Sequence, residues 1–208
     1  LQHKDGHYVP VLSRGFILRN ESGKPVRVSG TNTDLTERKQ SEAKIQRLSH
    51  LYAAISHCSQ AIVRCTNKEE LFQQICQDVV ALGGMKMAWI GLVDSSSLNV
   101  IPVASEGDDF GYLEHINISI DASLPQGQGP TGSAVRNNQP VLVQDFFNDS
   151  RTAAWRERGL ASGWGASAAL PLRNNGVAIG AFTLYSKETN AFDDEMCNLL
   201  ITMATDIS

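Results

Sequence analysis

Long apolar runs, an excess of basic charge and closely spaced cysteine pairs are all missing from this sequence of 208 residues. With a formal net charge of −4, the chain lacks the basic surface that is typical of nucleic-acid-binding proteins. Its longest apolar stretches, such as residues 177–184, are much shorter than the about 20 residues that cross a bilayer. We therefore expect no nucleic-acid partner and no membrane contact by this chain.

The four cysteines, Cys58, Cys65, Cys76 and Cys197, do not form the Cys-x-x-Cys spacing of metal or redox sites. Each lies in a helical pattern, which predicts reduced thiols in a cytoplasmic protein. The sequence also contains no Ser-His-Asp order, no cluster with metal-ligand spacing and no phosphate-cradling glycine motif. We therefore expect no catalytic residue and no metal site.

A long helix is the main feature of the N-terminal third. Residues 31–82 contain neither proline nor glycine, so a continuous helix is allowed there. Apolar side chains recur at spacings of three and four residues, with Ser59 as the one polar member of the series: Ile45, Leu48, Tyr52, Ile55 and Ile62. A repeat near 3.5 residues is typical of a coiled coil. We expect residues 37–66 to form a linker helix that pairs with its copy in a homodimer.

Short strands precede this helix. Residues 1–36 contain two turn sequences, at 4–6 and 20–23, between segments of strand-forming residues. This arrangement predicts two or three antiparallel strands, and Asp34 or Thr36 is expected to cap the helix that follows. The sequence opens within a strand-like segment, so we expect it to be a fragment of a longer protein.

The remaining module, residues 67–208, mixes helix and strand patterns. Thr66 and Glu69 have capping-box spacing before an amphipathic helix. Residues 87–93 are apolar on both faces, as in a central strand, and residues 165–172 and 177–185 flank an Asn-Asn-Gly turn. This order predicts an α+β fold, in which an antiparallel sheet carries helices on one face and a loop-covered pocket on the other.

Two families resemble parts of the chain. Residues 4–7, 23–26 and 34–39 resemble the C-terminal strands and exit helix of a PAS sensor domain. From residue 66 onward the sequence is similar to GAF domains, in the segments WIG at 89–91, GQGPTGSA at 127–134, PVLVQD at 140–145, AALPL at 168–172, GAFTLY at 180–185 and FDDE at 192–195. Residues 87–91 and 155–158 look like those of GAF domains in bacterial cyclic di-GMP enzymes and sensor kinases.

The GAF resemblance implies a small-molecule pocket between the sheet and its covering loops. The expected wall residues are Asp108, Tyr112, Thr131, Ser133, Arg136, Asp145, Trp155, Arg158, Trp164, Ser167 and Tyr185. Free amides after Thr131, together with Arg158, would suit a carboxylate or a phosphate. The alternatives are that these residues only cap a helix or face solvent, and that the pocket holds no ligand.

Known GAF cofactors match this sequence poorly. Where cyclic-nucleotide GAF domains carry Asn-Lys, this chain has Ser186-Lys187, so neither cyclic AMP nor cyclic GMP is expected. Residues 83–196 contain no cysteine for a covalent bilin, and an isolated His115 is a poor haem ligand. The ligand is therefore an unknown small molecule.

Taken with the helix, the resemblances imply a non-enzymatic sensor fragment that relays a signal through its linker to an output domain. One alternative is a GAF domain that binds nothing and serves as a dimerisation spacer. The other is a thiol enzyme similar to free methionine sulfoxide reductases, which would need a reactive cysteine at the pocket.

Overall fold

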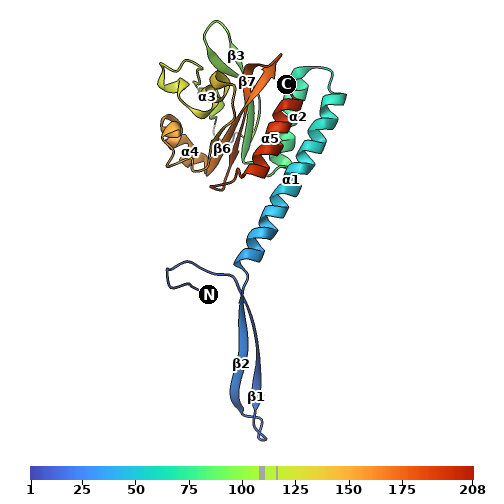
Figure 1. Ribbon diagram of the computed structural model, residues 1–208, viewed down its shortest axis with the longest axis vertical. Helices are drawn as coiled ribbons and strands as arrows, with labels where there is room; N and C mark the ends of the chain where they lie inside the picture. The colour runs from blue at the N-terminus through green and yellow to red at the C-terminus, as the bar shows by residue number, and fades with distance from the viewer. Residues whose placement is uncertain (108–110, 116) are drawn as a thin grey trace. The chain divides into compact units, whose positions relative to one another are not determined.

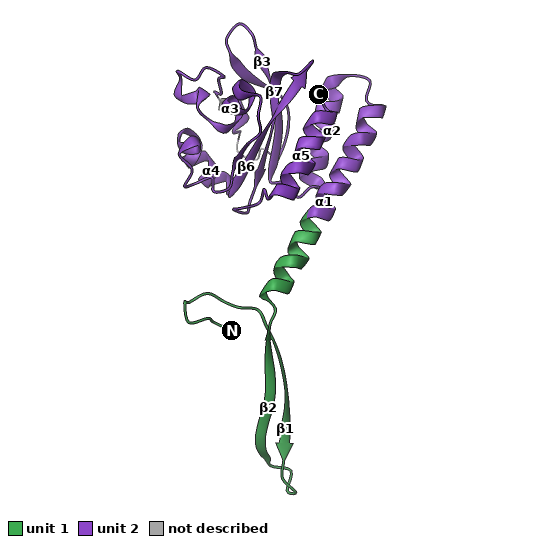
Figure 2. Cartoon of the chain, viewed as in Figure 1, with its two compact units in different colours: residues 1–47 green, residues 48–208 purple. Residues whose placement is uncertain are grey.

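A two-stranded antiparallel hairpin forms most of the N-terminal unit. The computed structural model describes residues 1–107, 111–115 and 117–208, and the chain divides into two compact units, residues 1–47 and 48–208 (Figure 2). In the smaller unit, β1 (Val11–Arg19) pairs with β2 (Pro25–Asp34). Large apolar side chains of the hairpin are exposed, with Phe16 at 60% and Val28 at 73%. The hairpin therefore has little core of its own.

Helix α1 (Thr36–Arg64) follows the hairpin, and the boundary between the units falls within it. The helix starts as the sequence predicts, because the Asp34 carboxylate accepts hydrogen bonds from the Thr36 amide and hydroxyl. These hydrogen bonds lower the pKa of Asp34. The helix ends before Asn67, so the glycine-free segment contains two helices rather than one.

One face of α1 packs on the larger unit. Its buried residues follow helical spacing and are Leu51, Ala54, Cys58 and Ala61. The residues of the predicted coiled-coil series lie beside this face: Leu48 and Ile55 are half-buried, whereas Ile45, Tyr52 and Ile62 are 67%, 55% and 36% exposed. The helix is thus a packed element of its own domain and also carries a partly exposed apolar stripe.

A five-stranded antiparallel sheet forms the centre of the larger unit, with the order β4-β3-β7-β6-β5 (Figure 1). Its strands are β3 (Met87–Asp94), β4 (Asn99–Glu106), β5 (Val141–Val143), β6 (Ala166–Asn174) and β7 (Val177–Ser186). Helices α2 (Lys68–Ala81) and α5 (Asp194–Asp206) cover one face together with α1. The predicted α+β fold is confirmed.

The sheet separates two hydrophobic clusters because side chains alternate along each strand. On β3, Ala88 and Ile90 pack toward the helices, whereas Met87 and Trp89 belong to the cluster on the opposite face. The β6–β7 hairpin turns at Asn175 and Gly176, both with positive φ, as the Asn-Asn-Gly sequence predicts. The predicted cap of α2 is wrong by one residue: Asn67, not Thr66, accepts the amide hydrogen bond from Glu70.

Short helices and loops cover the second face of the sheet (Figure 1). They are η1 (Leu113–His115), η2 (Pro125–Gly127), α3 (Pro130–Asn137), η3 (Ser150–Trp155) and α4 (Arg156–Ser162). In the described part of the chain, no helix has both the length and the apolar character to cross a membrane.

Candidate functional site

Aromatic side chains gather on the loop-covered face of the sheet. The rings of Trp164 and Tyr185 stack with centroids 3.9 Å apart and an interplanar angle of 25°. Tyr112 meets Trp164 edge-on at 4.8 Å, and Phe146 meets it edge-on at 5.4 Å. The Tyr112 and Tyr185 hydroxyl oxygens lie 3.3 Å apart. These contacts make one wall of the site rigid and apolar.

A small cavity lies against this cluster, with a volume of about 10 Å³. This volume corresponds to roughly one water molecule. Its lining residues come from β6, β7, α3 and the covering loops, and they are Tyr112, Ile118, Gly129, Pro130, Thr131, Phe146, Thr152, Trp155, Ser167, Thr183 and Tyr185. This lining contains no charged side chain among the residues that the structure describes.

The cavity contains a hydroxyl group without a hydrogen-bond partner. Ser167 is 1% exposed, and its Oγ has no partner among the described residues. By contrast, the hydroxyls of Thr131 and Thr183 lie 3.2 Å apart and pair with each other. A second buried polar atom without a partner in the described chain, Trp89 Nε1, belongs to the same aromatic cluster. Because buried polar groups are normally hydrogen-bonded, the site has unused hydrogen-bonding capacity.

Trp155 lines the cavity on the side of the covering loops. A Cβ atom at Gly129 would lie only 2.3 Å from Trp155 Cη2, so the indole packs directly on the backbone of Gly129. Only a glycine permits this close approach. Thr152 in the same segment donates hydrogen bonds to the carbonyls of Phe146 and Asp149. The segment is therefore held both by packing and by polar contacts.

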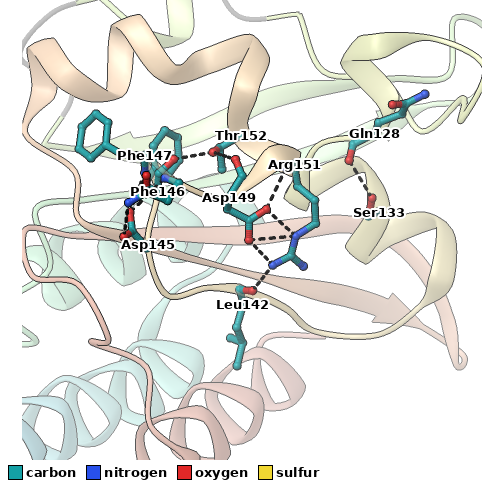
Figure 3. A network of polar contacts seen from close by, with 10 residues as sticks. Gln128, Ser133, Leu142, Asp145, Phe146, Phe147, Asp149, Arg151 and Thr152 are labelled. Atoms are coloured by element: carbon teal, nitrogen blue, oxygen red, sulfur yellow. Dashed lines mark hydrogen bonds and ion pairs between the residues drawn. The ribbon is translucent and has the colours of Figure 1, made fainter.

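An ion pair fixes the start of this covering segment (Figure 3). Asp149 caps η3 by accepting from the Arg151 amide, and Arg151 Nη2 donates to Asp149 Oδ2 at 2.6 Å. The same guanidinium donates to the Leu142 carbonyl at 2.8 Å. The Arg151 side chain holds the pKa of the Asp149 carboxyl below its usual value.

The residues predicted from the GAF resemblance differ in where the structure places them. Five of them line the cavity: Tyr112, Thr131, Trp155, Ser167 and Tyr185. Trp164 supports the site by stacking on Tyr185. Ser133, Arg136, Asp145 and Arg158 do not line the cavity, and Asp108 lies outside the described residues.

The charged candidates make loop contacts instead of lining the cavity. Arg158 is exposed and donates to the Tyr112 carbonyl at 3.4 Å, and Arg136 donates to the Gly127 carbonyl at 2.7 Å and to Ser133 Oγ. Asp145 accepts from the amides of the following turn and from the Asn148 side chain, which lowers the pKa of Asp145. Among the described residues, therefore, no cationic side chain lines the cavity.

Sequence reasoning missed about half of the lining, namely Ile118, Gly129, Pro130, Phe146, Thr152 and Thr183. Thr183 could have been predicted from the sequence pattern, because it is two residues from Tyr185 on the same strand and must lie on the same face of the sheet. Phe146 and Thr152 carry no such signal, since their position depends on how the covering loop folds back.

No described cysteine lines the cavity. Cys58 and Cys76 are buried in the helix-side cluster, and burial raises the pKa of Cys58 to about 12 and that of Cys76 as well. Burial likewise raises the pKa of Cys197 and Cys65. A raised pKa disfavours the thiolate that nucleophilic chemistry needs.

The comparisons with known proteins agree with this architecture. The family model of the GAF domain matches residues 65–208. The free methionine-R-sulfoxide reductase of Neisseria meningitidis, solved in complex with its substrate, aligns with a TM-score of 0.63 at 16% identity, over 76% of this chain and 85% of that one.

Two GAF domains give a similar result. The GAF domain of the Acinetobacter phosphoenolpyruvate-protein phosphotransferase aligns with a TM-score of 0.61 at 13% identity, over 76% of this chain and 90% of that one. The A. aeolicus nlh2 GAF domain, in an inactive state, aligns with a TM-score of 0.59 at 14% identity, over 76% and 93%. At these identities the structural likeness shows the fold alone. No curated protein matches the sequence.

The family model covers more than half of the chain, so this protein belongs to the GAF domain family. The GAF domain is a small-molecule sensing fold of signalling proteins.

Proposed function

We propose that this chain is a regulatory sensor fragment whose GAF domain binds a small molecule and transmits the binding event through α1. The output domain would be a cyclic di-GMP enzyme or a histidine kinase, and the N-terminal hairpin would be the end of a PAS domain. The observation that carries this proposal is the cavity with the Ser167 hydroxyl, which has no partner among the described residues, on the opposite face of the sheet from the cluster that contains the buried residues of α1.

The two central strands connect the cavity to the helix-side cluster, to which α1 contributes. Ser167 lines the cavity, and the next residue on β6, Ala168, lies in the helix-side cluster with Leu51 and Ala54 of α1. Likewise on β7, Thr183 lines the cavity and the next residue, Leu184, lies in the helix-side cluster. A shift of these central strands on ligand binding would therefore change how the helices pack on the sheet, since packed interiors transmit displacement.

Thermal unfolding with a ligand panel tests sensing. A ligand at one hundred times its dissociation constant adds about 2.7 kcal/mol, which corresponds to a Tm increase of roughly 5–10 °C for a domain of this size. If no ligand shifts the Tm, the domain is better described as the dimerisation spacer.

We also propose that the exposed stripe of α1 pairs with a second copy of the chain. Ile45, Tyr52 and Ile62 continue an apolar series that the domain itself leaves accessible, and such a seam favours a partner helix. The variant Ile45→Asp should dissociate the dimer in analytical ultracentrifugation. The matched control is Leu160→Asp, at a leucine of α4 that is 62% exposed, which should leave the dimer intact. A dimer that survives in Ile45→Asp would contradict this role of α1.

We further propose that the fragment is not catalytic. The thiol-enzyme alternative is disfavoured by the burial of Cys58 and Cys76 and by the raised thiol pKa values. Reduction of free methionine sulfoxide by the wild-type chain, with loss of that activity in Cys76→Ser or Cys197→Ser, would overturn this point.

A further inference from the structure

Building on the proposed sensor function, we propose that the cavity takes a small uncharged planar molecule. Its ring would lie in the aromatic cluster, and its hydrogen-bonding group would pair with the Ser167 hydroxyl. Trp155 would move off Gly129 to admit it. Three features of the site lead to this ligand class: its lack of charge, its unused hydroxyl and the way in which it is closed.

The lining argues against a charged ligand. Among the described residues it contains no carboxylate and no cationic side chain, and the neighbouring cations Arg136 and Arg158 donate to loop carbonyls. An ion that enters would lose its hydration without gaining a counter-charge from a described side chain of the lining, and this cost is high in a buried site. The aromatic rings attract cations, but this attraction is smaller than the desolvation cost.

The polar side chains on the cavity wall carry neutral hydroxyls. Thr131 and Thr183 are already paired with each other, 3.2 Å apart. Ser167 is the lining residue whose hydroxyl has no partner in the described chain, and a hydroxyl can both donate and accept. An amide, a lactam or a ring nitrogen would satisfy it. A purely apolar ligand would leave it unpaired and bind less well.

The closure of the site suggests where the ligand enters. With a volume of about 10 Å³, the closed cavity does not have room for a ring. Trp155 is the most exposed of the large lining side chains, at 9%, and its indole packs on the backbone of Gly129. Its displacement would open space for a planar group in contact with Tyr185 and Ser167, which line the same cavity.

An isosteric series separates the ligand classes: benzamide is neutral, benzoate is anionic and benzamidinium is cationic. Each is titrated into the 208-residue chain and followed by protein NMR. We expect benzamide to bind at least about tenfold more tightly than either ion, and Ser167→Ala to weaken benzamide about tenfold, the factor that corresponds to one hydrogen bond. The control Ser119→Ala changes a buried serine outside the lining and should leave benzamide binding unchanged.

The variant Trp155→Leu keeps an apolar side chain at the entrance but removes the indole, and we expect it to bind benzamide more tightly than the wild type. Preference for benzoate or benzamidinium would overturn the ligand class and leave sensing intact. Absence of benzamide binding in both the wild type and Trp155→Leu, or equal binding by Ser167→Ala, would also overturn it. Benzamide binding without any change in hydrogen exchange of α1 would instead contradict the proposed relay alone.

Discussion

Replacing Ser167 by alanine should stabilise the ligand-free protein, which is unusual for a change at a fully buried position. The Ser167 hydroxyl is 1% exposed and has no partner among the described residues. Burial of such a group costs about 1–3 kcal/mol. Removing one oxygen enlarges a cavity of about 10 Å³ only slightly, and the cavity term of about 24 cal/mol per Å³ returns less than about 0.5 kcal/mol. We expect a net gain of about 1 kcal/mol.

Thr183→Val provides the matched control on the neighbouring strand. It is nearly isosteric, but it removes the partner of Thr131 and leaves that hydroxyl unpaired in the same cavity. We expect a loss of about 1–2 kcal/mol. The two variants therefore delete one hydroxyl each from the same cavity and should change stability in opposite directions.

Urea unfolding followed by tryptophan fluorescence measures both effects. All three tryptophans, Trp89, Trp155 and Trp164, belong to the aromatic cluster of the larger unit, so the signal reports that unit. In thermal unfolding, a change of 1 kcal/mol in the free energy of unfolding corresponds to roughly 2–4 °C in Tm for a domain of this size. If Ser167→Ala loses about 1 kcal/mol or more, the hydroxyl is satisfied in the native protein, and the proposed pairing of this hydroxyl with a ligand is refuted.

Two further predictions concern the covering segment and α1. Arg151 depresses the pKa of Asp149, so the stability from this pair is present above the unfolded-state pKa of about 3.9 and is lost as the pH falls through the lower folded value. Arg151→Ala should therefore lose stability less steeply in acid than the wild type. An unchanged pH dependence of the unfolding free energy, measured by urea unfolding, would contradict this. Leu51→Ala should cost about 2–4 kcal/mol of unfolding free energy, because the Leu51 side chain is fully buried. Ile45→Ala on the same helix, at a residue that is 67% exposed, should cost less than about 0.5 kcal/mol in the monomeric protein. Equal costs in the same urea unfolding assay would mean that α1 does not pack as described.

Local signals in the sequence were sufficient for much of the fold. The turn between β6 and β7 needs two consecutive positive φ angles, and Asn175 and Gly176 tolerate them at low cost. The apolar residues on both faces of 87–93 predicted a central strand covered on both sides, and β3 is buried on both faces over residues 87–91. The cap of α2 was placed one residue early because Thr66 and Asn67 are both good caps, and only the path of the chain decides between them.

The packing partner of α1 could not be predicted from periodicity. Spacings of three and four residues fit the buried set that includes Leu51 and Cys58 and also the exposed set that includes Ile45 and Tyr52. The two sets occupy neighbouring faces of one helix. A repeat shows that a helix has an apolar face, but it does not show whether the partner is its own sheet or another copy.

The site was predictable where it lies on regular strands and less so where loops build it. Ser167 and Tyr185 were expected from the GAF resemblance, and the regular alternation of strands β6 and β7 then places both on the pocket face. Arg158 and Asp145 were expected from the same resemblance, yet both bond to nearby loop atoms. A loop residue's direction depends on tertiary contacts that leave no periodic trace.

The unpaired hydroxyl and the position of α1 have a joint consequence for signalling. A sensor needs a ligand-free state that is less stable than its bound state, because a ligand shifts an equilibrium only by its differential affinity. In the proposed sensor, Ser167 would supply this difference at the cavity, and Ala168, its neighbour on β6, lies in the helix-side cluster that contains Leu51. If that coupling operates, Ser167→Ala should also reduce the hydrogen-exchange difference of α1 between the ligand-free and the benzamide-saturated protein, because the variant has lost the group on which binding acts. An undiminished difference at matched saturation would show that the helix responds to occupancy of the cavity and not to satisfaction of this hydroxyl.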